Sequence, residues 1–356
     1  MSLHPVSAAE AAARLPEFDA LIDARSPAEF AADHLPGAVN WPVLDDEERR
    51  VVGTLYTQVS ALQARKVGAA MVARNIATHL DRWAAPLPRE WRPLVYCWRG
   101  GQRSGSLAWF LGQIGFRTVQ LQGGYKGFRA VVRAGLDALP ATLCFTVLTG
   151  RTGSGKTRLL QALAAQGAQV LDLEGLACHR GSILGAWPGT AQPTQKRFDT
   201  LIWDALRLAD PSRPLFVESE SARIGALAVP EALLLRMRQH GRVVQVEMAD
   251  AARVALLLQD YAHFAAAPEA FCKLLDGLIE LRGRATVASW QAQARAGQWA
   301  QVFGSLMAQH YDPLYMRSLQ RSYADLVGAP AVSVGDGGTA AMAAAAATLL
   351  TLSAGN

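Results

Sequence analysis

The chain of 356 residues has few cysteines and few charges for its length. Its four cysteines lie far apart and form no CxxC pair, so neither a zinc knuckle nor a disulfide framework is indicated. Charged residues make up only 18% of the chain, and no apolar run approaches the ~20 residues that a membrane span needs. The first residues lack the basic-then-apolar pattern of a secretory signal. We therefore expect a compact cytoplasmic protein with no membrane partner, rather than a disordered chain or a coiled coil.

Lysine is also scarce. Only five of the 35 Lys and Arg residues are lysine, and the rest are arginine. The formal net charge is +5. Arginine forks bind phosphate groups and stack on bases, so this composition permits a nucleic-acid partner. An arginine-rich composition inherited from a GC-rich genome explains the same numbers equally well.

The length predicts about two domains, and the 51% of hydrophobic residues suffices to give each a core. Strands alternate with helices in the first domain, over residues 1–138. We expect strands at Ala20–Asp23, Pro93–Tyr96 and Thr118–Leu121, a turn-rich loop at Pro36–Pro42 and a helix at Ser104–Ile114 that ends at Gly115. A helical insertion of about residues 45–90 should pack on the sheet through the apolar stripe Leu62, Val67, Met71, Val72 and Ile76.

The second domain, residues 141–356, follows a helical linker at Gly127–Leu139 and repeats the alternation. Its expected strands are Leu143–Thr149, Gln169–Leu173, Pro214–Val217 and Arg242–Met248. The pattern is helical from Ala251 to Asp325, and again in the alanine-rich tail Thr339–Leu352. Together the two domains predict an α/β protein with two parallel sheets and a helical C-terminal region.

Residues Gly150–Thr157 match the phosphate-binding pattern GxxxxGK[ST], between an expected strand and an expected helix. The candidate phosphate-binding residues are Gly150, Gly153, Ser154, Gly155, Lys156 and Thr157. In such a loop the backbone N–H groups surround an anion, the lysine adds charge and the threonine can hold Mg²⁺. Glu218 and Glu220 end a neighbouring strand and are candidates for a magnesium or substrate site, or simply a solvated loop edge. No guanine-recognition motif is evident, which disfavours a GTPase.

Cys97 lies in a second candidate anion site, where the strand Pro93–Tyr96 is followed by Trp98-Arg99-Gly100-Gly101-Gln102-Arg103. Small residues let successive amides point inward, while Arg99 and Arg103 favour negative charge at the centre. A thiol placed there should ionise more easily and act as a nucleophile. A buried structural cysteine is the alternative. Cys144, Cys178 and Cys272 have no such surroundings.

The first domain resembles a rhodanese domain. The resemblance lies in Leu21-Ile22-Asp23-Ala24-Arg25, Glu29-Phe30, His34-Leu35-Pro36-Gly37-Ala38-Val39-Asn40, Cys97 and Gly123-Gly124-Tyr125. In that pattern His34 belongs to a structural turn. Five residues separate Cys97 from Arg103, one more than in the usual rhodanese loop and equal to the Cys-x5-Arg spacing of cysteine phosphatases, so a phosphatase stays an alternative.

The combination of a rhodanese-like domain with a P-loop domain resembles the tRNA 2-selenouridine synthase family. Several further motifs carry this resemblance: Asp46-Glu47-Glu48-Arg49, Gly53-Thr54-Leu55-Tyr56, Asp172-Leu173-Glu174-Gly175-Leu176-Ala177, His179-Arg180-Gly181-Ser182, Val217-Glu218-Ser219-Glu220-Ser221 and Tyr311-Asp312-Pro313-Leu314-Tyr315. The resemblance implies a transferase that replaces sulfur by selenium in the wobble 2-thiouridine of the tRNAs for Lys, Glu and Gln. It implies selenophosphate, made by a separate enzyme, as donor, and a geranylated intermediate made from geranyl diphosphate.

Carried onto this sequence, the resemblance makes Cys97 the selenium carrier, as S-selanylcysteine, with Arg99 and Arg103 holding the donor's phosphate. We expect the P-loop around Lys156 to hold geranyl diphosphate, although a nucleotide fits the same motif. Trp98, unless it packs against the sheet, and Arg180 are candidates for RNA contact. No tightly bound cofactor is expected beyond Mg²⁺ as a candidate.

Two other functions are compatible with these motifs. One is a rhodanese-type sulfurtransferase, or the phosphatase, fused to a P-loop small-molecule kinase. The other is a non-enzymatic sulfur carrier that is controlled by a nucleotide.

Overall fold

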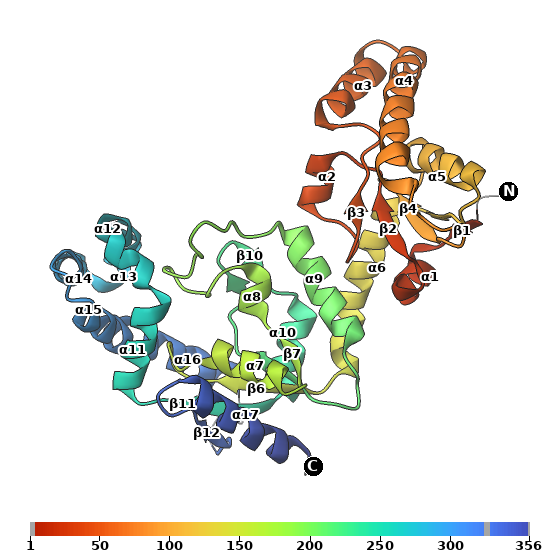
Figure 1. Cartoon of the computed structure of the whole chain (residues 1–356). Helices are drawn as coiled ribbons and strands as arrows, with labels where there is room; N and C mark the ends of the chain where they lie inside the picture. Colours follow the sequence, from red (N-terminus) through yellow and green to blue (C-terminus); the bar gives the residue numbers. More distant parts are fainter. Residues whose placement is uncertain (1–3, 324–327, 355–356) are drawn as a thin grey trace. The chain divides into compact units, whose positions relative to one another are not determined.

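Two compact units make up the structure, a computed structural model that describes residues 4–323 and 328–354 (Figure 1). The first unit comprises Met1–Gly135 and Thr194–Asp204, and the second comprises Leu136–Pro193 and Ala205–Asn356. The sequence predicts a boundary near residue 140 but not the return of residues 194–204 to the first unit. The buried carboxylate of Asp33 explains this return, because it accepts hydrogen bonds from the hydroxyls of Tyr125 at 2.8 Å and Thr200 at 3.0 Å.

The first unit is built on a five-stranded sheet in which every strand pair is parallel. The spatial order is β1 (His4–Val6), β5 (Val119–Leu121), β4 (Pro93–Tyr96), β2 (Ala20–Asp23) and β3 (Val39–Asn40). Its helices are α1 (Ala8–Ala13), α2 (Pro27–Ala32), α5 (Gln102–Ile114) and α6 (Gly124–Ala138), with a 3₁₀ turn at Leu15–Glu17. Leu107 and Leu111 of α5 pack against Ile22 and Val95 of the sheet. Gly115 ends α5 in the left-handed conformation, as predicted.

The insertion forms a helical hairpin of α3 (Asp46–Gln58) and α4 (Ala61–His79), which lie side by side in Figure 1, followed by a π-helical turn at Leu80–Ala84. Asp45 caps α3 by accepting a hydrogen bond from the N–H of Glu48 at 2.7 Å. The expected apolar stripe is correct at Ile76, which is fully buried, and wrong at Leu62, which is exposed. The contact with α3 uses Gly68 against Val52 instead, because a small residue lets the two helices approach closely.

The second unit is built on another five-stranded parallel sheet. The spatial order is β12 (Ala331–Ser333), β11 (Arg242–Glu247), β6 (Phe145–Thr149), β8 (Leu215–Glu218) and β7 (Gln169–Leu171). The other elements of this part are α7 (Lys156–Ala165), α8 (Leu173–Ala177), α10 (Glu231–His240), α17 (Thr339–Ala354), the antiparallel pair β9 (Arg223–Ile224) and β10 (Leu227–Ala228), and a 3₁₀ turn at Leu139–Thr142. Helix α9 (Gln195–Leu208) belongs to the first unit up to Asp204 and to the second unit beyond it. Apolar residues of α7 and α17 pack with the sheet in one core, so the alanine-rich tail is a packing element.

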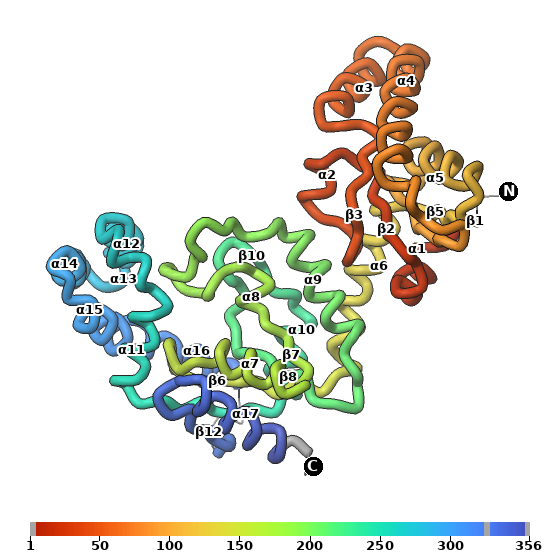
Figure 2. Tube along the Cα trace, viewed as in Figure 1, coloured from red at the N-terminus to blue at the C-terminus, as the bar shows by residue number. Residues whose placement is uncertain are grey.

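A helical segment completes the second unit and has a core of its own. It contains α11 (Asp250–Asp260), α12 (Pro268–Leu275), α13 (Ile279–Arg282), α14 (Arg284–Arg295), α15 (Trp299–Leu306) and α16 (Asp312–Ser322), 3₁₀ turns at Ala262–Ala266 and Asp276–Leu278, and a π-helical turn at Met307–Tyr311. Figure 2 shows α11, α14 and α15 beside one another. The predicted helical stretch is thus confirmed to Ser322, and its predicted end at Asp325 lies outside the described residues.

Most predicted strands are present, with shifted ends. The predicted strand Gln169–Leu173 ends at Leu171, because the Asp172 side chain accepts a hydrogen bond from Gly175 N–H at 2.7 Å and starts α8. The sequence did not predict β1, β3, β9, β10 or β12, since two or three residues are too few to display an alternating pattern. Among the described residues, no helix is both long enough and apolar enough to cross a bilayer.

Candidate functional site

Cys97 directly follows β4 and is almost fully buried. The hydroxyl of Ser104, also buried, donates a hydrogen bond to its sulfur at 3.1 Å. The side-chain amide of Gln120 donates in turn to the Ser104 hydroxyl at 3.1 Å. This chain of contacts fixes the position of the sulfur at the end of the strand, and the role of Cys97 as a nucleophile stays a prediction.

The loop after Cys97 is held by the start of α6. The N–H groups of Tyr125 and Lys126 donate to the carbonyl oxygens of Cys97 and Trp98 at 2.8 and 2.9 Å. A Cβ atom on Gly124, whose φ is +54°, would lie 2.2 Å from the Cys97 carbonyl oxygen. Only glycine allows this approach, and the motif Gly123-Gly124-Tyr125 therefore fixes the backbone of the cysteine loop.

The two arginines expected to hold an anion at this loop differ in their surroundings. Arg103 donates a hydrogen bond to Glu29 at 2.6 Å. Burial tends to raise the pKa of Glu29, but the hydrogen bond and charge of Arg103 outweigh this and lower it. Arg99 is exposed, and no hydrogen bond or ion pair joins it to the rest of the described chain. Arg99 is therefore free to bind an incoming anion, whereas Arg103 can do so only after it releases Glu29.

Trp98 and His34 lie near this loop. The ring of Trp98 packs on Tyr125 with a centroid distance of 5.4 Å, and 36% of the residue remains exposed. Trp98 is therefore not part of the sheet's core, and its outer part can stack on a base. His34 stacks on Phe30 and is hydrogen-bonded to the Phe30 carbonyl at 2.9 Å, as a residue of a structural turn would be.

The phosphate-binding loop joins β6 to α7 and contains all six of the predicted residues. Lys156 donates from Nζ to the carbonyl oxygen of Gly150 at 2.8 Å and lies 5.1 Å from the centre of the Tyr315 ring. Tyr315 also accepts a hydrogen bond from Gly150 N–H at 2.9 Å and is hydrogen-bonded to Ser219 at 2.7 Å. The Tyr311–Tyr315 motif therefore supports the loop from a position more than 150 residues away in the sequence.

Arg253 supports the same loop and is fully buried. Its Nη2 donates to the carbonyl oxygen of Thr152 at 2.7 Å, and its Nη1 donates to Asp312 at 2.9 Å. Sequence reasoning missed Arg253, because an arginine inside an amphipathic helix carries no local motif. It also missed Glu174, whose carboxylate accepts a hydrogen bond from the hydroxyl of Thr157 at 3.1 Å. Glu174 follows a predicted strand, and a carboxylate at the end of a parallel strand is a candidate for the binding site, so its position could have indicated this role.

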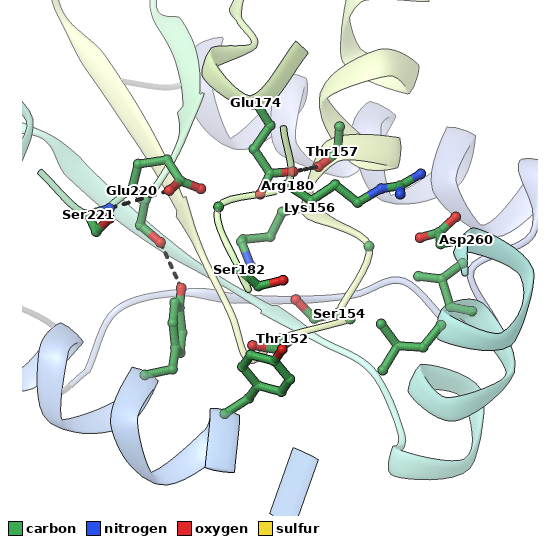
Figure 3. A pocket seen from close by; sticks show the side chains of 18 of the residues that line it. Thr152, Ser154, Lys156, Thr157, Glu174, Arg180, Ser182, Glu220, Ser221 and Asp260 are labelled. Carbon is green, nitrogen blue, oxygen red and sulfur yellow. Dashed lines mark hydrogen bonds between the residues drawn. The ribbon is translucent and has the colours of Figure 1, made fainter. Parts of the chain in front are cut away.

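Several carboxyl groups lie beside the loop (Figure 3). Burial raises the pKa of Glu174, and it raises that of Glu218 well above its usual range, with the charges of Asp172, Glu174 and Glu220 adding to the effect on Glu218. Burial and the charge of Glu174 raise the pKa of Glu220 to about 8. The backbone N–H of Glu174 donates to Glu218 at 2.9 Å. These contacts place Glu218 behind Glu174, and Glu220 rather than Glu218 lines the pocket.

No group of three or more His, Cys, Asp or Glu side chains arranged to hold a metal was found in residues 4–323 and 328–354. The predicted Mg²⁺ therefore stays a prediction. The residues best suited to it are Thr157 and Glu174, since hard cations bind hydroxyl and carboxylate oxygens together with phosphate oxygens of a ligand.

The phosphate-binding loop forms one wall of a pocket of about 770 Å³ within the second unit. Arg180, Glu174 and Glu220 contribute ionisable groups to it. Much of the remaining wall is aliphatic or aromatic, and this part consists of Ile183, Trp187, Leu256, Leu257, Tyr261, Tyr311, Leu314, Tyr315, Leu319 and Tyr323. The pocket therefore suits a ligand that carries both a phosphate and an apolar group.

Substituting Gly124 tests the tight approach at the cysteine loop. We expect Gly124→Ala to lower the free energy of unfolding by about 2–4 kcal/mol, because the new Cβ clashes with a backbone oxygen at positive φ. Gly112→Ala is the matched control, since a Cβ there has no atom within 4 Å and alanine favours a helix. The measurement is urea unfolding followed by fluorescence. An equal stability of the two variants would contradict the proposed role of Gly124.

The raised pKa of Glu220 predicts a pH effect. The folded protein keeps a proton on Glu220 that the unfolded chain releases between the ordinary pKa of 4.5 and about 8, so stability falls as pH rises through this window. We expect Glu220→Gln to flatten the fall in melting temperature between pH 5 and 8, measured with EDTA and without phosphate. The exposed Glu280→Gln is the control. A wild-type slope in Glu220→Gln would show that the residue does not titrate in this range.

Comparison with known proteins agrees with both units. Residues 7–131 match the family described as a Rhodanese-like domain, and residues 143–275 match the tRNA 2-selenouridine synthase AAA domain. The chain is 37% identical over 245 residues to a tRNA 2-selenouridine synthase of Nitrosomonas europaea, an alignment that covers 68% of this chain and 63% of the relative. It is 32% identical over 350 residues to that of Shewanella piezotolerans, covering 90% of this chain and 94% of the relative. The chain therefore belongs to the tRNA 2-selenouridine synthase family.

Proposed function

We propose that this protein replaces sulfur by selenium at the wobble 2-thiouridine of the tRNAs for Lys, Glu and Gln. Selenophosphate, supplied by a separate enzyme, is the selenium donor, and geranyl diphosphate alkylates the sulfur first. The observation that carries the proposal is family membership over both units, with a buried cysteine in the loop of one unit and a phosphate loop in the pocket of the other. The names of the relatives state the selenation, while the two donors are what the resemblance to the family implies.

Cys97 carries selenium as S-selanylcysteine in this proposal. Its sulfur is shielded by burial and hydrogen-bonded to Ser104, which suits a covalent carrier that must not react with water-borne thiols. Arg99 is exposed beside the loop and has no competing partner among the described residues, so it can bind the phosphate of the donor. Arg103 joins it when Glu29 is displaced.

The pocket at the phosphate loop receives geranyl diphosphate. Lys156 and the N–H groups of Gly155 and Thr157 bind the diphosphate, and the apolar wall accommodates the hydrocarbon chain. Alkylation solves a chemical difficulty. The sulfur of a thiocarbonyl leaves poorly, but an alkylated sulfur departs as a thiol, so a selenium nucleophile can displace it at C2 of the base.

The tRNA is bound by arginines of the helical insertion. Arg50, Arg65 and Arg74 are exposed on α3 and α4, and such side chains bind phosphates of the anticodon arm. Trp98 offers a partly exposed ring on which a displaced base can stack.

Replacing Cys97 tests the selenium-transfer half of the proposal. We expect Cys97→Ser to abolish conversion of 2-thiouridine tRNA to the selenium form, because a hydroxyl cannot carry selenium. Nucleoside mass spectrometry of tRNA after incubation with selenophosphate and geranyl diphosphate measures the product. The exposed Cys144→Ser is the control and should react like the wild type. An undiminished rate in Cys97→Ser would refute the role of this thiol.

Replacing Lys156 tests the geranyl half. We expect Lys156→Ala to weaken binding of geranyl diphosphate by roughly 10–100-fold in isothermal titration, since charge-assisted hydrogen bonds are worth roughly 1.5–3 kcal/mol. Lys273→Ala, at an exposed position of α12, is the control. An unchanged affinity in Lys156→Ala would remove geranyl diphosphate from this loop. Strong ATP turnover without tRNA would favour the kinase alternative instead.

A further inference from the structure

Polar atoms that are buried without a hydrogen-bond partner among the described residues gather in the pocket of the second unit. They include the Ser154 hydroxyl, Nη1 of Arg180, Nε1 of Trp187 and the hydroxyl of Tyr323. Leaving a buried donor without a partner costs about 1–3 kcal/mol, so a folded protein rarely keeps several in one place without a use. Arg180 and Trp187 can only donate. The unused groups therefore call for a ligand rich in hydrogen-bond acceptors.

Arg180 is the charged member of this set and is held in place by its surroundings. Its backbone N–H donates to the Gly185 carbonyl at 2.8 Å, and its carbonyl accepts from Ser182 N–H at 2.8 Å. The guanidinium lies 5.2 Å from the centre of the Tyr261 ring. No hydrogen bond or ion pair to a carboxylate occupies this guanidinium in the described part of the chain. Fixed position and free donors together are typical of a ligand-binding arginine.

The guanidinium also lies on the same side of the pocket as the phosphate loop. Burial raises the pKa of Glu174, the carboxyl group that is hydrogen-bonded to Thr157 of the loop, and the positive charges of Lys156 and Arg180 oppose this rise. In Figure 3 its side chain extends past Lys156 and Thr157 toward Asp260. Arg180 and the phosphate loop therefore line one and the same pocket.

We propose that Arg180 binds the diphosphate in this pocket and neutralises it as it leaves. The identity of the diphosphate as that of geranyl diphosphate rests on the function proposed above. In the transfer step a lone pair of the thiouridine sulfur forms a bond to C1 of the allylic chain. The C1–O bond breaks, its electron pair departs on the diphosphate, and the N3 proton of the base is released to water. Negative charge grows on the leaving oxygen, where the donors of Arg180 and Lys156 stabilise it.

This assignment differs from the RNA contact that the motif His179–Ser182 suggests in the sequence. A phosphate of an RNA backbone is bound by exposed cations, whereas Nη1 of Arg180 is buried in a pocket next to the phosphate loop. A guanidinium in that position recognises a small anion that enters the pocket. The two assignments predict different losses on mutation.

Isothermal titration of the full-length protein with inorganic pyrophosphate tests the proposal. We expect Arg180→Gln to weaken pyrophosphate binding roughly 10–100-fold. Arg180→Lys should weaken it less, because lysine keeps the positive charge although it lacks the planar, two-pronged guanidinium. Arg284→Gln, at an exposed position of α14, should bind as the wild type does. Circular dichroism confirms that each variant is folded. In single-turnover geranylation of 2-thiouridine tRNA, Arg180→Gln should slow the step while tRNA affinity in filter binding stays unchanged.

Unchanged pyrophosphate affinity in both Arg180 variants would overturn the proposal, and a loss of tRNA affinity alone would return Arg180 to RNA binding. These failures are distinguishable from failure of the proposed function. If pyrophosphate binding needs both Lys156 and Arg180 but no geranyl group is transferred, the anion site stands and the geranyl donor is wrong. If Lys156→Ala alone loses pyrophosphate, the loop keeps its proposed role and Arg180 has none.

Discussion

Both candidate sites depend on how closely one backbone segment can approach another at the carboxyl end of a parallel strand. At the cysteine loop, Gly124 lies so close to the Cys97 carbonyl that no side chain fits between them. This contact brings the N–H groups that begin α6 onto the loop's own carbonyl groups. The loop's remaining amides can then face an anion, since the carbonyl groups that would repel it are already hydrogen-bonded. The position of the thiol follows from this arrangement of the backbone.

The backbone of the phosphate loop is also held in place, but by side chains from segments that are distant in the sequence. Tyr315 and Arg253 form hydrogen bonds with two backbone groups of the loop, Gly150 N–H and the Thr152 carbonyl. The buried carboxyl groups of Glu218 and Glu220 lie beside the loop. Burial raises the pKa of both groups, so negative charge is disfavoured at their positions. A ligand that brings its own negative charge must therefore be bound by Lys156, Arg180 and the loop amides rather than by the acidic side of the pocket.

The difference between what the sequence predicted and what it did not follows from the distance between interacting residues in the chain. Gly150–Thr157 and Cys97–Arg103 are contiguous, and short-range geometry determines their shape, so their places in the fold were predictable. Glu29 with Arg103, Tyr315 with Gly150 and Arg253 with Thr152 are contacts across 74, 165 and 101 residues. Spacing in a single sequence carries no information about such pairs. The motifs that contain Glu29 and Tyr315 could still be recognised in the sequence, but the residues that they contact could not.

In the function that we propose, the two sites divide one exchange reaction into two steps with different needs. Alkylation requires an electrophile whose leaving group is stabilised by fixed cations, and we propose that Lys156 and Arg180 in the pocket of the second unit serve this step. Selenium transfer requires a nucleophile, and a strongly cationic pocket would hold that nucleophile in its least reactive, ion-paired form. At the cysteine loop, by contrast, Ser104 donates one hydrogen bond to the sulfur and Arg103 is paired with Glu29. Placing each step in its own unit lets the charge around each reacting atom be set independently.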